Sequence, residues 1–383
     1  MDLHIKVTTA PGLEGILASE LKSLGLSPRY ESFGAVELKT DWTSTAKVML
    51  HCRTGSRVLL RIAEFAAKHE AMLYDQVRRV DWPSWFSVDQ TFSIRVVGDF
   101  SGLGMARTFA PLKIKDAICD EFRKKLDARP SVDRSDSDAP IVAFFRNGRC
   151  ELSLDLTGQP LYRRGYRGDG GTAPIKEHRA AALLRFLGYD GSRPFLDPFC
   201  GSGTIAIEAA LIASGRPPGS LRDPKSFPAA RVSAEAHDAV MKAWSLNKDQ
   251  EVKVPSCAIL GSDIEEEAVQ TARTNARRAG VEDLITFQVA DSRTIEAPDT
   301  DVVSNPPYGE RVSETEDAVK LLAEFTQRVK SHCPGTRMAL VLPHGPLSKG
   351  VNLKADQKLP VMSAPLELRF MKFSVFRKKQ DSF

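Results

Sequence analysis

From Lys176 onward, short apolar runs of strand type alternate with longer runs of helix type, and this alternation constrains the fold more than any other feature. The predicted strands are 195–196, 258–260, 285–289, 302–303 and 338–342, and the predicted helices are 176–187, 204–213, 265–279 and 315–331. Strands that alternate with helices form a parallel sheet covered by helices on both faces. Two late strand-like runs, near 359–363 and 367–376, are expected to close an antiparallel edge. The sequence therefore predicts an α/β fold for this half.

Residues 1 to about 157 show another pattern, with short helices and strands in mixed order. Apolar residues between Leu13 and Leu24 follow helical spacing and stop at Gly25. A second amphipathic helix covers 114–126. Half-buried strands are predicted at 92–96 and 152–156, and the lysines that fall largely outside the helical apolar stripe include Lys113 and Lys115. This half is expected to form one or two small α+β domains.

The segment between the two halves, 158–174, is rich in glycine and has a proline near each end, which disfavours a regular element. It is therefore predicted to be a connector. The side chains that suit phosphate contact and base stacking in it are Arg163, Arg164 and Arg167, interleaved with Tyr162 and Tyr166. The other interpretation is a solvated linker whose arginines pair with neighbouring acids.

The whole chain has 383 residues, so two or three domains are expected, and its net charge of +4 permits a nucleic-acid partner without requiring one. No apolar run approaches the length of a membrane span, and the start lacks the layout of a secretion signal, so a cytoplasmic protein is expected. The six cysteines show no CxxC spacing, and no two histidines stand four residues apart in a metal-binding pattern. We expect no metal, and nothing points to an obligate protein partner.

A glycine turn follows the first predicted strand of the α/β half, in the segment 195–204, Phe-Leu-Asp-Pro-Phe-Cys-Gly-Ser-Gly-Thr. Gly201 and Gly203 would let the backbone pass close to a ligand, and Asp197 ends the strand at the edge where open α/β sheets bind ligands. The spacing of Gly201, Gly203 and Ala206 also matches the dinucleotide fingerprint. An NAD(P)-dependent oxidoreductase must therefore be considered.

Two observations argue against a dinucleotide. No acidic residue stands at a strand end about twenty residues further on, where the ribose would need one. The Asp197 carboxylate beside the turn would repel pyrophosphate but would suit a cationic amino or sulfonium group. S-adenosylmethionine carries both of these groups, so the sequence favours it as the cofactor.

Polar side chains also end the later strands. Asp263 follows the second strand, where a carboxylate can accept hydrogen bonds from ribose hydroxyls. Asp291 follows the third strand and could accept from the adenine amino group. Each acid alone could instead be a helix N-cap or a surface charge. A suitable group at every strand end is harder to attribute to chance.

The fourth strand is followed by Asn305-Pro306-Pro307-Tyr308, which indicates chemistry on a nucleobase amino group. Such a nitrogen is a poor nucleophile because its lone pair is delocalised into the ring. The amide oxygen of Asn305 and the next carbonyl can accept its two N–H bonds, and the two prolines hold that carbonyl outward. Tyr308 supplies a flat face for stacking.

These motifs together resemble class I S-adenosylmethionine-dependent methyltransferases, in the branch that modifies amino groups. The long interval 212–256 looks like an insertion seen in the ribosomal large-subunit methyltransferase K/L family. The resemblance implies a Rossmann-like domain with a mostly parallel seven-stranded sheet and an antiparallel edge, preceded by a ferredoxin-like/THUMP module. The implied domains are 1–65 ferredoxin-like, 66–157 THUMP, 158–175 basic linker and 176–383 catalytic.

The resemblance also assigns roles to residues. The expected catalytic residues are Asn305, Pro306, Pro307 and Tyr308. The expected cofactor-binding residues are Asp197, Pro198, Phe199, Cys200, Gly201, Ser202, Gly203, Thr204, Asp263, Ile264, Asp291, Ser292 and Asn305. Apart from the resemblance, the expected RNA-binding residues are Arg163, Arg164 and Arg167 of the connector, together with Lys113 and Lys115.

The implied substrate is structured RNA, with N2 of a guanosine in 23S rRNA favoured. Transfer RNA competes with it, because THUMP-bearing enzymes often act on tRNA. Adenine N6 in DNA or RNA stays open, since Asn-Pro-Pro-Tyr does not separate the two aromatic amines. An NAD(P)-dependent oxidoreductase is the remote alternative.

Overall fold

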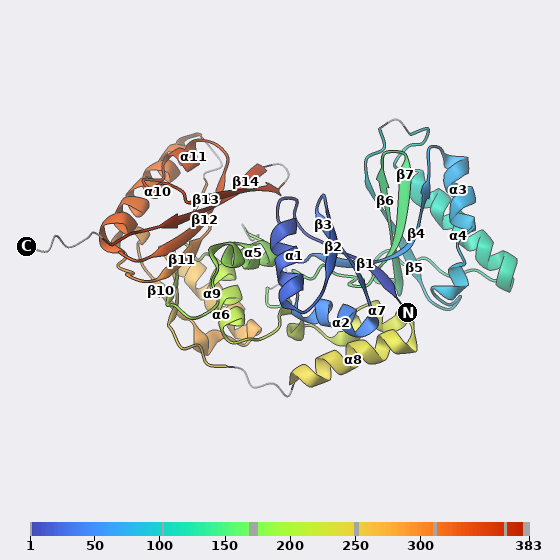
Figure 1. Ribbon diagram of the computed structural model, residues 1–383, viewed down its shortest axis with the longest axis horizontal. Helices are drawn as coiled ribbons and strands as arrows, with labels where there is room; N and C mark the ends of the chain where they lie inside the picture. The colour runs from blue at the N-terminus through green and yellow to red at the C-terminus, as the bar shows by residue number, and fades with distance from the viewer. Residues whose placement is uncertain are drawn as a thin grey trace, which may run out of the picture.

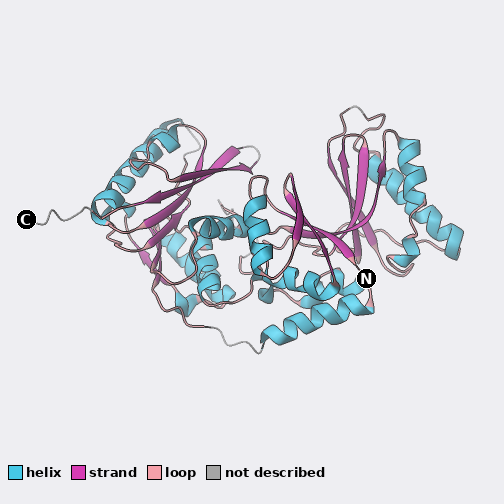
Figure 2. Cartoon of the chain, in the orientation of Figure 1, coloured by secondary structure: helices cyan, strands magenta, loops and turns pink. Residues whose placement is uncertain are grey.

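The computed structural model describes residues 2–101, 103–167, 175–248, 253–308, 312–363 and 366–377. Its backbone forms two seven-stranded sheets that lie side by side along the long axis of the molecule (Figures 1 and 2). Part of the predicted linker, 168–174, and residues 309–311 after the Pro-Pro corner lie outside the described residues. No helix in the described ranges is long and apolar enough to cross a membrane.

The C-terminal sheet has the order β10-β9-β8-β11-β12-β14-β13. Its strands are β8 (Phe195–Asp197), β9 (Ile259–Asp263), β10 (Thr286–Val289), β11 (Asp301–Ser304), β12 (Arg337–Pro343), β13 (Gln357–Ser363) and β14 (Leu366–Ser374). The first five strands in the spatial order are parallel, and β14 runs antiparallel to both of its neighbours. The antiparallel strand therefore lies one place inside the edge, and the edge strand β13 runs in the same direction as the parallel strands.

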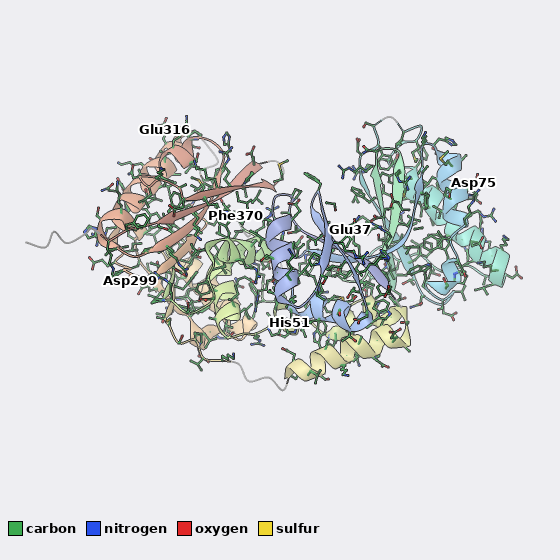
Figure 3. The ribbon with its side chains drawn as sticks, viewed as in Figure 1. Glu37, His51, Asp75, Asp299, Glu316 and Phe370 are labelled. Atoms are coloured by element: carbon green, nitrogen blue, oxygen red, sulfur yellow. The ribbon has the colours of Figure 1, made fainter. Side chains whose placement is uncertain are left out.

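Helices cover both faces of this sheet, as the alternation predicted. They are α5 (Glu177–Leu187), α6 (Thr204–Ala213), α9 (Glu266–Ala279), α10 (Val312–His332) and α11 (Pro346–Lys349). Neighbouring residues of β11 show why the strand is apolar throughout: Val303 packs in the core with α5, α6 and α9, whereas Val302 packs in the core with α10. Phe370 of β14 is labelled in Figure 3, and its ring centroid lies 6.0 Å from that of Phe186 on α5.

The N-terminal sheet is continuous across the boundary predicted at residue 65. Its strands are β1 (Leu3–Thr8), β2 (Pro28–Ser32), β3 (Ala35–Thr40), β4 (Arg57–Ala66), β5 (Phe92–Gly98), β6 (Ala139–Arg146) and β7 (Arg149–Asp155), in the order β2-β3-β1-β4-β7-β6-β5. The ten-residue strand β4 pairs with β1 through its first half and with β7 along most of its length. The two expected small domains thus share one sheet and one apolar core.

Helices α1 (Glu14–Ser23) and α2 (Trp42–His51) belong to the ferredoxin-like part, and α3 (Glu70–Arg78) and α4 (Ala110–Leu126) pack on the outer face of the other part (Figure 1). Gly25, with φ +80°, follows α1 where the apolar spacing predicted a stop. Single 3₁₀ turns occur at η1 (Trp82–Ser84), η2 (Pro218–Leu221), η3 (Pro224–Ser226), η4 (Glu282–Leu284) and η5 (Ser292–Thr294).

The insertion after α6 does not pack on the C-terminal sheet, although it lies within the predicted catalytic domain. Its helix α8 (Ala234–Lys248) lies along α2, and the short helix α7 (Ala229–Val232) packs against α8 (Figure 1). Phe227, Val240 and Trp244 are buried in the N-terminal core. The insertion, which the prediction placed in the catalytic domain 176–383, therefore packs on the N-terminal unit, because apolar side chains in 227–244 find their partners there.

The N-terminal unit, built on the first sheet, and the C-terminal unit, built on the second, contact each other directly. Pro11 accepts a backbone hydrogen bond from Met362 at 2.8 Å, and the neighbouring Gly12 has φ +98° and stands so close that a Cβ would lie 2.1 Å from the Pro360 oxygen. Arg53 donates to the backbone oxygens of Leu211 and Arg216. The loop 10–13 and the edge strand β13 thus form a close contact between the units.

Candidate active site

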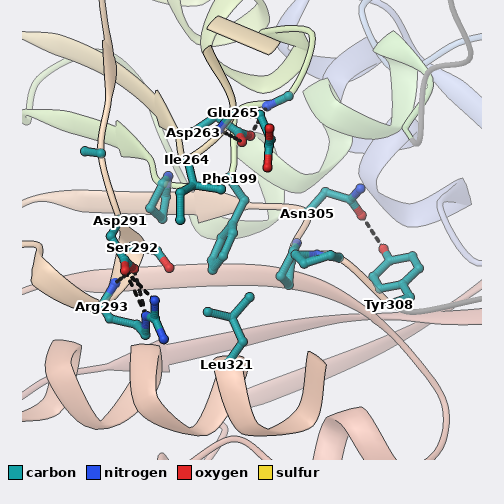
Figure 4. A pocket seen from close by; sticks show the side chains of 15 residues that line it. Phe199, Asp263, Ile264, Glu265, Asp291, Ser292, Arg293, Asn305, Tyr308 and Leu321 are labelled. Atoms are coloured by element: carbon teal, nitrogen blue, oxygen red, sulfur yellow. Dashed lines mark hydrogen bonds and ion pairs between the residues drawn. The ribbon is translucent and has the colours of Figure 1, made fainter. Parts of the chain in front are cut away.

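Four polar strand ends gather at one edge of the C-terminal sheet. The strands β10, β9, β8 and β11 are neighbours and run parallel, so their carboxyl ends lie in a row. Asp197 and Asp263 end β8 and β9, Asn305 follows β11 directly, and Asp291 follows β10 by two residues. A cavity of about 470 Å³ opens at this edge (Figure 4).

The cavity brings the glycine turn and the Pro-Pro corner together. Its lining residues from the predicted site are Pro198, Phe199, Gly201, Asp263, Ile264, Asp291, Ser292, Asn305, Pro306, Pro307 and Tyr308. Glu265, Ala290, Arg293 and Leu321 complete the lining. The predicted residues that lie behind the wall instead are Asp197, Cys200, Ser202, Gly203 and Thr204.

The two glycines of the turn serve different purposes. Gly201 has φ +50° and lines the cavity, and a Cβ at this position would have no described atom within 4 Å. Its N–H donates to Asp263 Oδ2 at 2.9 Å, which fastens the turn to the neighbouring strand. Gly203 has φ +82°, and a Cβ there would stand 2.9 Å from the Cβ of Ala272 on α9. Gly203 therefore permits close helix packing, whereas Gly201 leaves room for a ligand.

Asp197 is completely buried at the base of the turn. Its Oδ1 accepts hydrogen bonds from Ser304 Oγ at 2.5 Å and from the Phe199 N–H at 3.3 Å, whereas Oδ2 has no hydrogen-bond partner among the described residues. Burial, with a smaller contribution from the charge of Asp263, raises the pKa of Asp197 to about 7. A buried carboxylate oxygen without a partner is costly unless a cation binds it.

Asp263 keeps acceptor capacity although both of its oxygens already accept backbone N–H bonds, from Gly201 and from Glu265 at 3.1 Å. Each carboxylate oxygen has two lone pairs, so ribose hydroxyls can still bind. Beside it, Ile264 is 59% exposed and lines the cavity. An exposed isoleucine at this edge provides an apolar surface for a flat ring.

Asp291 is engaged in an ion pair that the sequence did not predict. Arg293 approaches both of its oxygens, with an Nη2–Oδ2 distance of 2.6 Å (Figure 4). These hydrogen bonds lower the pKa of Asp291. Arg293 also pairs with Glu324 at 3.4 Å. If Asp291 accepts a hydrogen bond from the adenine amino group, it must do so while it is paired with Arg293.

The Pro-Pro corner is held by its own tyrosine. The Tyr308 hydroxyl donates to Asn305 Oδ1 (Figure 4) and also lies 3.1 Å from the Val341 oxygen. Burial raises the pKa of Tyr308, so the hydroxyl stays protonated and able to donate. Pro306 is buried and Pro307 is exposed. A substrate amine that binds Asn305 Oδ1 must share or replace the tyrosine hydrogen bond.

Two residues that support the site were not predicted from the sequence. Asn275 on α9 is 5% exposed and donates to the Ser202 oxygen at 2.9 Å, which fixes the turn from the helix side. Arg293 was not anticipated either. A polar residue within the apolar stripe of 269–279 was the signal that could have revealed Asn275.

The RNA-contact prediction for Arg164 is wrong in this structure, because the side chain is 1% exposed and pairs with the fully buried Glu208 at 3.4 Å. Tyr166, which was expected to stack on bases, is also 1% exposed. Arg167 is half-buried and donates to the Ile175 oxygen and to Thr204 Oγ1, so it supports the start of α6 instead. The other interpretation is correct in that Arg164 pairs with an acid, but the side chain is buried rather than solvated and its partner Glu208 lies 44 residues away.

The other predicted RNA contacts remain accessible. Arg163 is exposed and donates to Gln159 Oε1 at 3.0 Å. Lys113 and Lys115 on α4 are partly exposed, and they pair with Glu70 and Asp116. These three residues lie outside the cavity lining.

The family model described as the RMKL-like methyltransferase domain matches residues 164–371, which is more than half of the chain. The chain belongs to the RMKL-like methyltransferase family. The THUMP domain model matches residues 67–155, and the model of the RlmL ferredoxin-like domain matches residues 4–59. The protein is thus a THUMP-containing methyltransferase, and the family explains why a Rossmann-like domain follows two small α+β parts.

Solved structures with the same architecture cover nearly the whole chain. A possible methylase from Clostridium difficile is 28% identical over 100% of both chains, with a TM-score of 0.87. A candidate methyltransferase complexed with SAH is 25% identical over 99% of both chains, with a TM-score of 0.88. A predicted N6-adenine-specific DNA methylase from Listeria monocytogenes is 26% identical, covers 97% of this chain and 96% of its own, and has a TM-score of 0.85.

S-adenosylmethionine is the cofactor of this methyltransferase, and the cavity suits it. The buried Oδ2 of Asp197 has no partner within the described ranges, which fits a cationic ammonium group behind the turn. Gly201 leaves space, Asp263 retains acceptor sites and Ile264 offers an apolar surface. The remote NAD(P) alternative is not supported.

Proposed function

We propose that this protein methylates the exocyclic amino group of a base in structured RNA, with N2 of a guanosine in 23S rRNA as the target. The supporting observation is that the corner 305–308 and the glycine turn line the same cavity. The THUMP domain supports RNA as the substrate class. Guanine N2 and 23S rRNA are favoured by the family likeness.

When bound, S-adenosylmethionine supplies an electrophilic methyl group on a sulfonium centre. On the protein side, Asp197 would hold the ammonium group, Asp263 the ribose hydroxyls, and Ile264 with Ser292 and Asp291 the adenine. The charged side chains of the described lining are the carboxylates of Asp263, Glu265 and Asp291 and the guanidinium of Arg293, so the net charge is negative and suits a cationic cofactor. The apolar lining from Phe199 and Leu321 excludes water from the reacting atoms.

The target amine would be held by the corner. Asn305 Oδ1 and the Pro306 carbonyl would accept its two N–H bonds and so direct the nitrogen lone pair toward the methyl group. Positioning of this kind can supply about 7–11 kcal/mol of a two-reactant barrier, so no separate nucleophile is needed. The ring of Tyr308 would stack on the extruded base and offset part of the few kcal/mol that leaving a helix costs.

Nucleoside mass spectrometry of fractionated rRNA and tRNA from a strain that lacks the gene tests the proposal. We expect N2-methylguanosine to fall in the 23S fraction and to return on complementation. Loss confined to the tRNA fraction would support tRNA as the substrate. Loss of N6-methyladenosine in either RNA or DNA would replace the guanine assignment.

A further inference from the structure

A second polar cavity, of about 520 Å³, lies on the N-terminal unit and is separate from the methyl-transfer site. Its walls come from β5 and β6 of the THUMP domain, from Arg57 at the start of β4, and from Ser226 and Pro228 of the insertion. Gly158 and Gln159, where the connector begins, complete one side. The start of β4, the THUMP strands with the beginning of the connector, and the insertion therefore meet at this cavity.

Guanidinium groups dominate its charge. Arg57, Arg95 and Arg134 line the cavity. These three positive charges are set against two lining carboxylates, those of Asp136 and Asp155. The cavity thus carries an excess of positive charge.

The buried carboxylate of Asp155 already has partners within the protein. Asp155 is 2% exposed, pairs with Arg57 and accepts from both the N–H and the hydroxyl of Thr157. Arg95 is 3.9 Å from the same carboxylate, near the limit for an ion pair, and its side chain is 48% exposed. Burial, and after it the positive charge of Arg57, lower the pKa of Arg95. The pairing of Arg95 is therefore weak, because its counter-charge Asp155 is held more closely by Arg57 and Thr157.

Arg134 is exposed, and no ion pair of its side chain is found in the part of the chain that the structure describes. Serine side chains also line the cavity, and Ser93 Oγ and Ser137 Oγ lie 2.6 Å apart. Arginine together with Ser and Gln side chains is the donor set that contacts phosphate oxygens in nucleic-acid complexes. Planar guanidinium groups also match phosphate in a bidentate manner.

We propose that this arginine cavity binds a phosphate group of the RNA substrate's backbone. The proposal rests on the proposed function, since it requires RNA as the substrate. A phosphate held where the THUMP sheet, the connector and the insertion meet would fix the RNA relative to the catalytic sheet. Because no aromatic ring is found among the described residues of its lining, the cavity would contribute affinity without reading the base.

The test measures binding of radiolabelled 23S rRNA, and in parallel total tRNA, to the full chain over a range of salt concentrations. The variants are the double substitution Arg95→Gln/Arg134→Gln and the single substitution Arg134→Gln. Arg134 is exposed, so its replacement leaves the fold intact. The matched control is Arg79→Gln/Arg123→Gln, which removes two exposed arginines at the end of α3 and on α4, outside the cavity lining.

We expect the double variant to bind RNA at least about tenfold more weakly at low salt, and its salt slope to fall by about one unit for each phosphate that it no longer binds. Affinity for S-adenosylhomocysteine should not change, and the control should bind RNA as the wild type does. Equal RNA affinity of cavity variant and control would overturn the cavity proposal. If the wild type binds RNA through these arginines but methylates none, the proposed function fails while the cavity assignment stands.

Discussion

The Ser304 hydroxyl donates a hydrogen bond to Oδ1 of Asp197 at 2.5 Å, beneath the cavity floor. This contact joins the end of β11, which leads into the Pro-Pro corner, to the end of β8, which leads into the glycine turn. Strand pairing between β8 and β11 brings the two ends together. The cofactor side and the base side of the cavity are therefore positioned by one buried hydrogen bond as well as by the sheet.

Cofactor affinity should depend on pH through Asp197. Its pKa of about 7 leaves the carboxyl largely protonated at pH 6 and ionised at pH 8, and a cationic ammonium group binds the ionised form. We expect S-adenosylhomocysteine to bind about tenfold more weakly at pH 6 than at pH 8. Titration calorimetry measures this. The Asp197→Asn variant should bind weakly at both values, and a persistent pH effect in it would assign the titration elsewhere.

The same group should make stability depend on pH. The folded-state pKa of Asp197 lies above the ordinary value of 3.8, so its contribution is fully present below about pH 4 and is lost as the pH rises toward 7. Asp197→Asn removes this loss. The unfolding temperature of the variant relative to wild type should therefore rise between pH 4 and pH 7. A constant difference across this range would contradict the buried, unpartnered state of Asp197.

Substitution of the two glycines of the turn should have different effects on stability and on cofactor affinity. Gly203→Ala places a methyl group against Ala272 at positive φ, so we expect a loss of about 1–3 kcal/mol in unfolding free energy. Gly201→Ala meets no described atom and should cost less stability, but its methyl group enters the cavity and should reduce S-adenosylhomocysteine affinity. Thermal unfolding and calorimetry on both variants check this. The reverse pattern would show that Gly201 does not face the cofactor.

We expect Arg164 to stabilise the fold rather than to contact RNA. Arg164→Met leaves Glu208 buried without its partner, and breaking a buried pair in this way costs about 3–5 kcal/mol. Arg163→Met, one residue earlier and exposed, should change stability by no more than about 0.5 kcal/mol. Chemical denaturation compares the two. Similarly small changes in unfolding free energy in both variants would show that Arg164 is not a buried structural residue and would again allow an RNA contact.

The positions of the strands and of their polar ends could be predicted from the sequence because they depend on local patterns. Val302 and Val303 each face an apolar core, so the strand shows as a continuous apolar run, and the residue that ends it must lie at the sheet edge. Helix α4 likewise shows its buried stripe in its spacing. These features need no knowledge of distant partners.

Other features depend on long-range packing that no local pattern contains. The partner of Arg164 is Glu208, 44 residues away, so its burial could not be inferred from a glycine-rich, basic segment. The path of α8 back onto α2 is fixed by Trp244 and its neighbours entering another unit's core. The ion pair between Asp291 and Arg293 is local, but whether it faces the cavity depends on the turn geometry at η5.

The most direct test of whether cofactor and base meet in one cavity uses the Asn305→Ala variant. Its rate of methyl transfer from isotopically labelled S-adenosylmethionine to 23S rRNA is measured. The affinity of the same preparation for S-adenosylhomocysteine is measured in parallel. The wild type should place the label on guanine N2. We expect the variant to lose about two to three orders of magnitude in turnover while its cofactor affinity stays nearly unchanged. Asn305→Asp, which keeps an acceptor oxygen, should retain part of the activity. Transfer by Asn305→Ala at the wild-type rate would contradict the role assigned to the Pro-Pro corner.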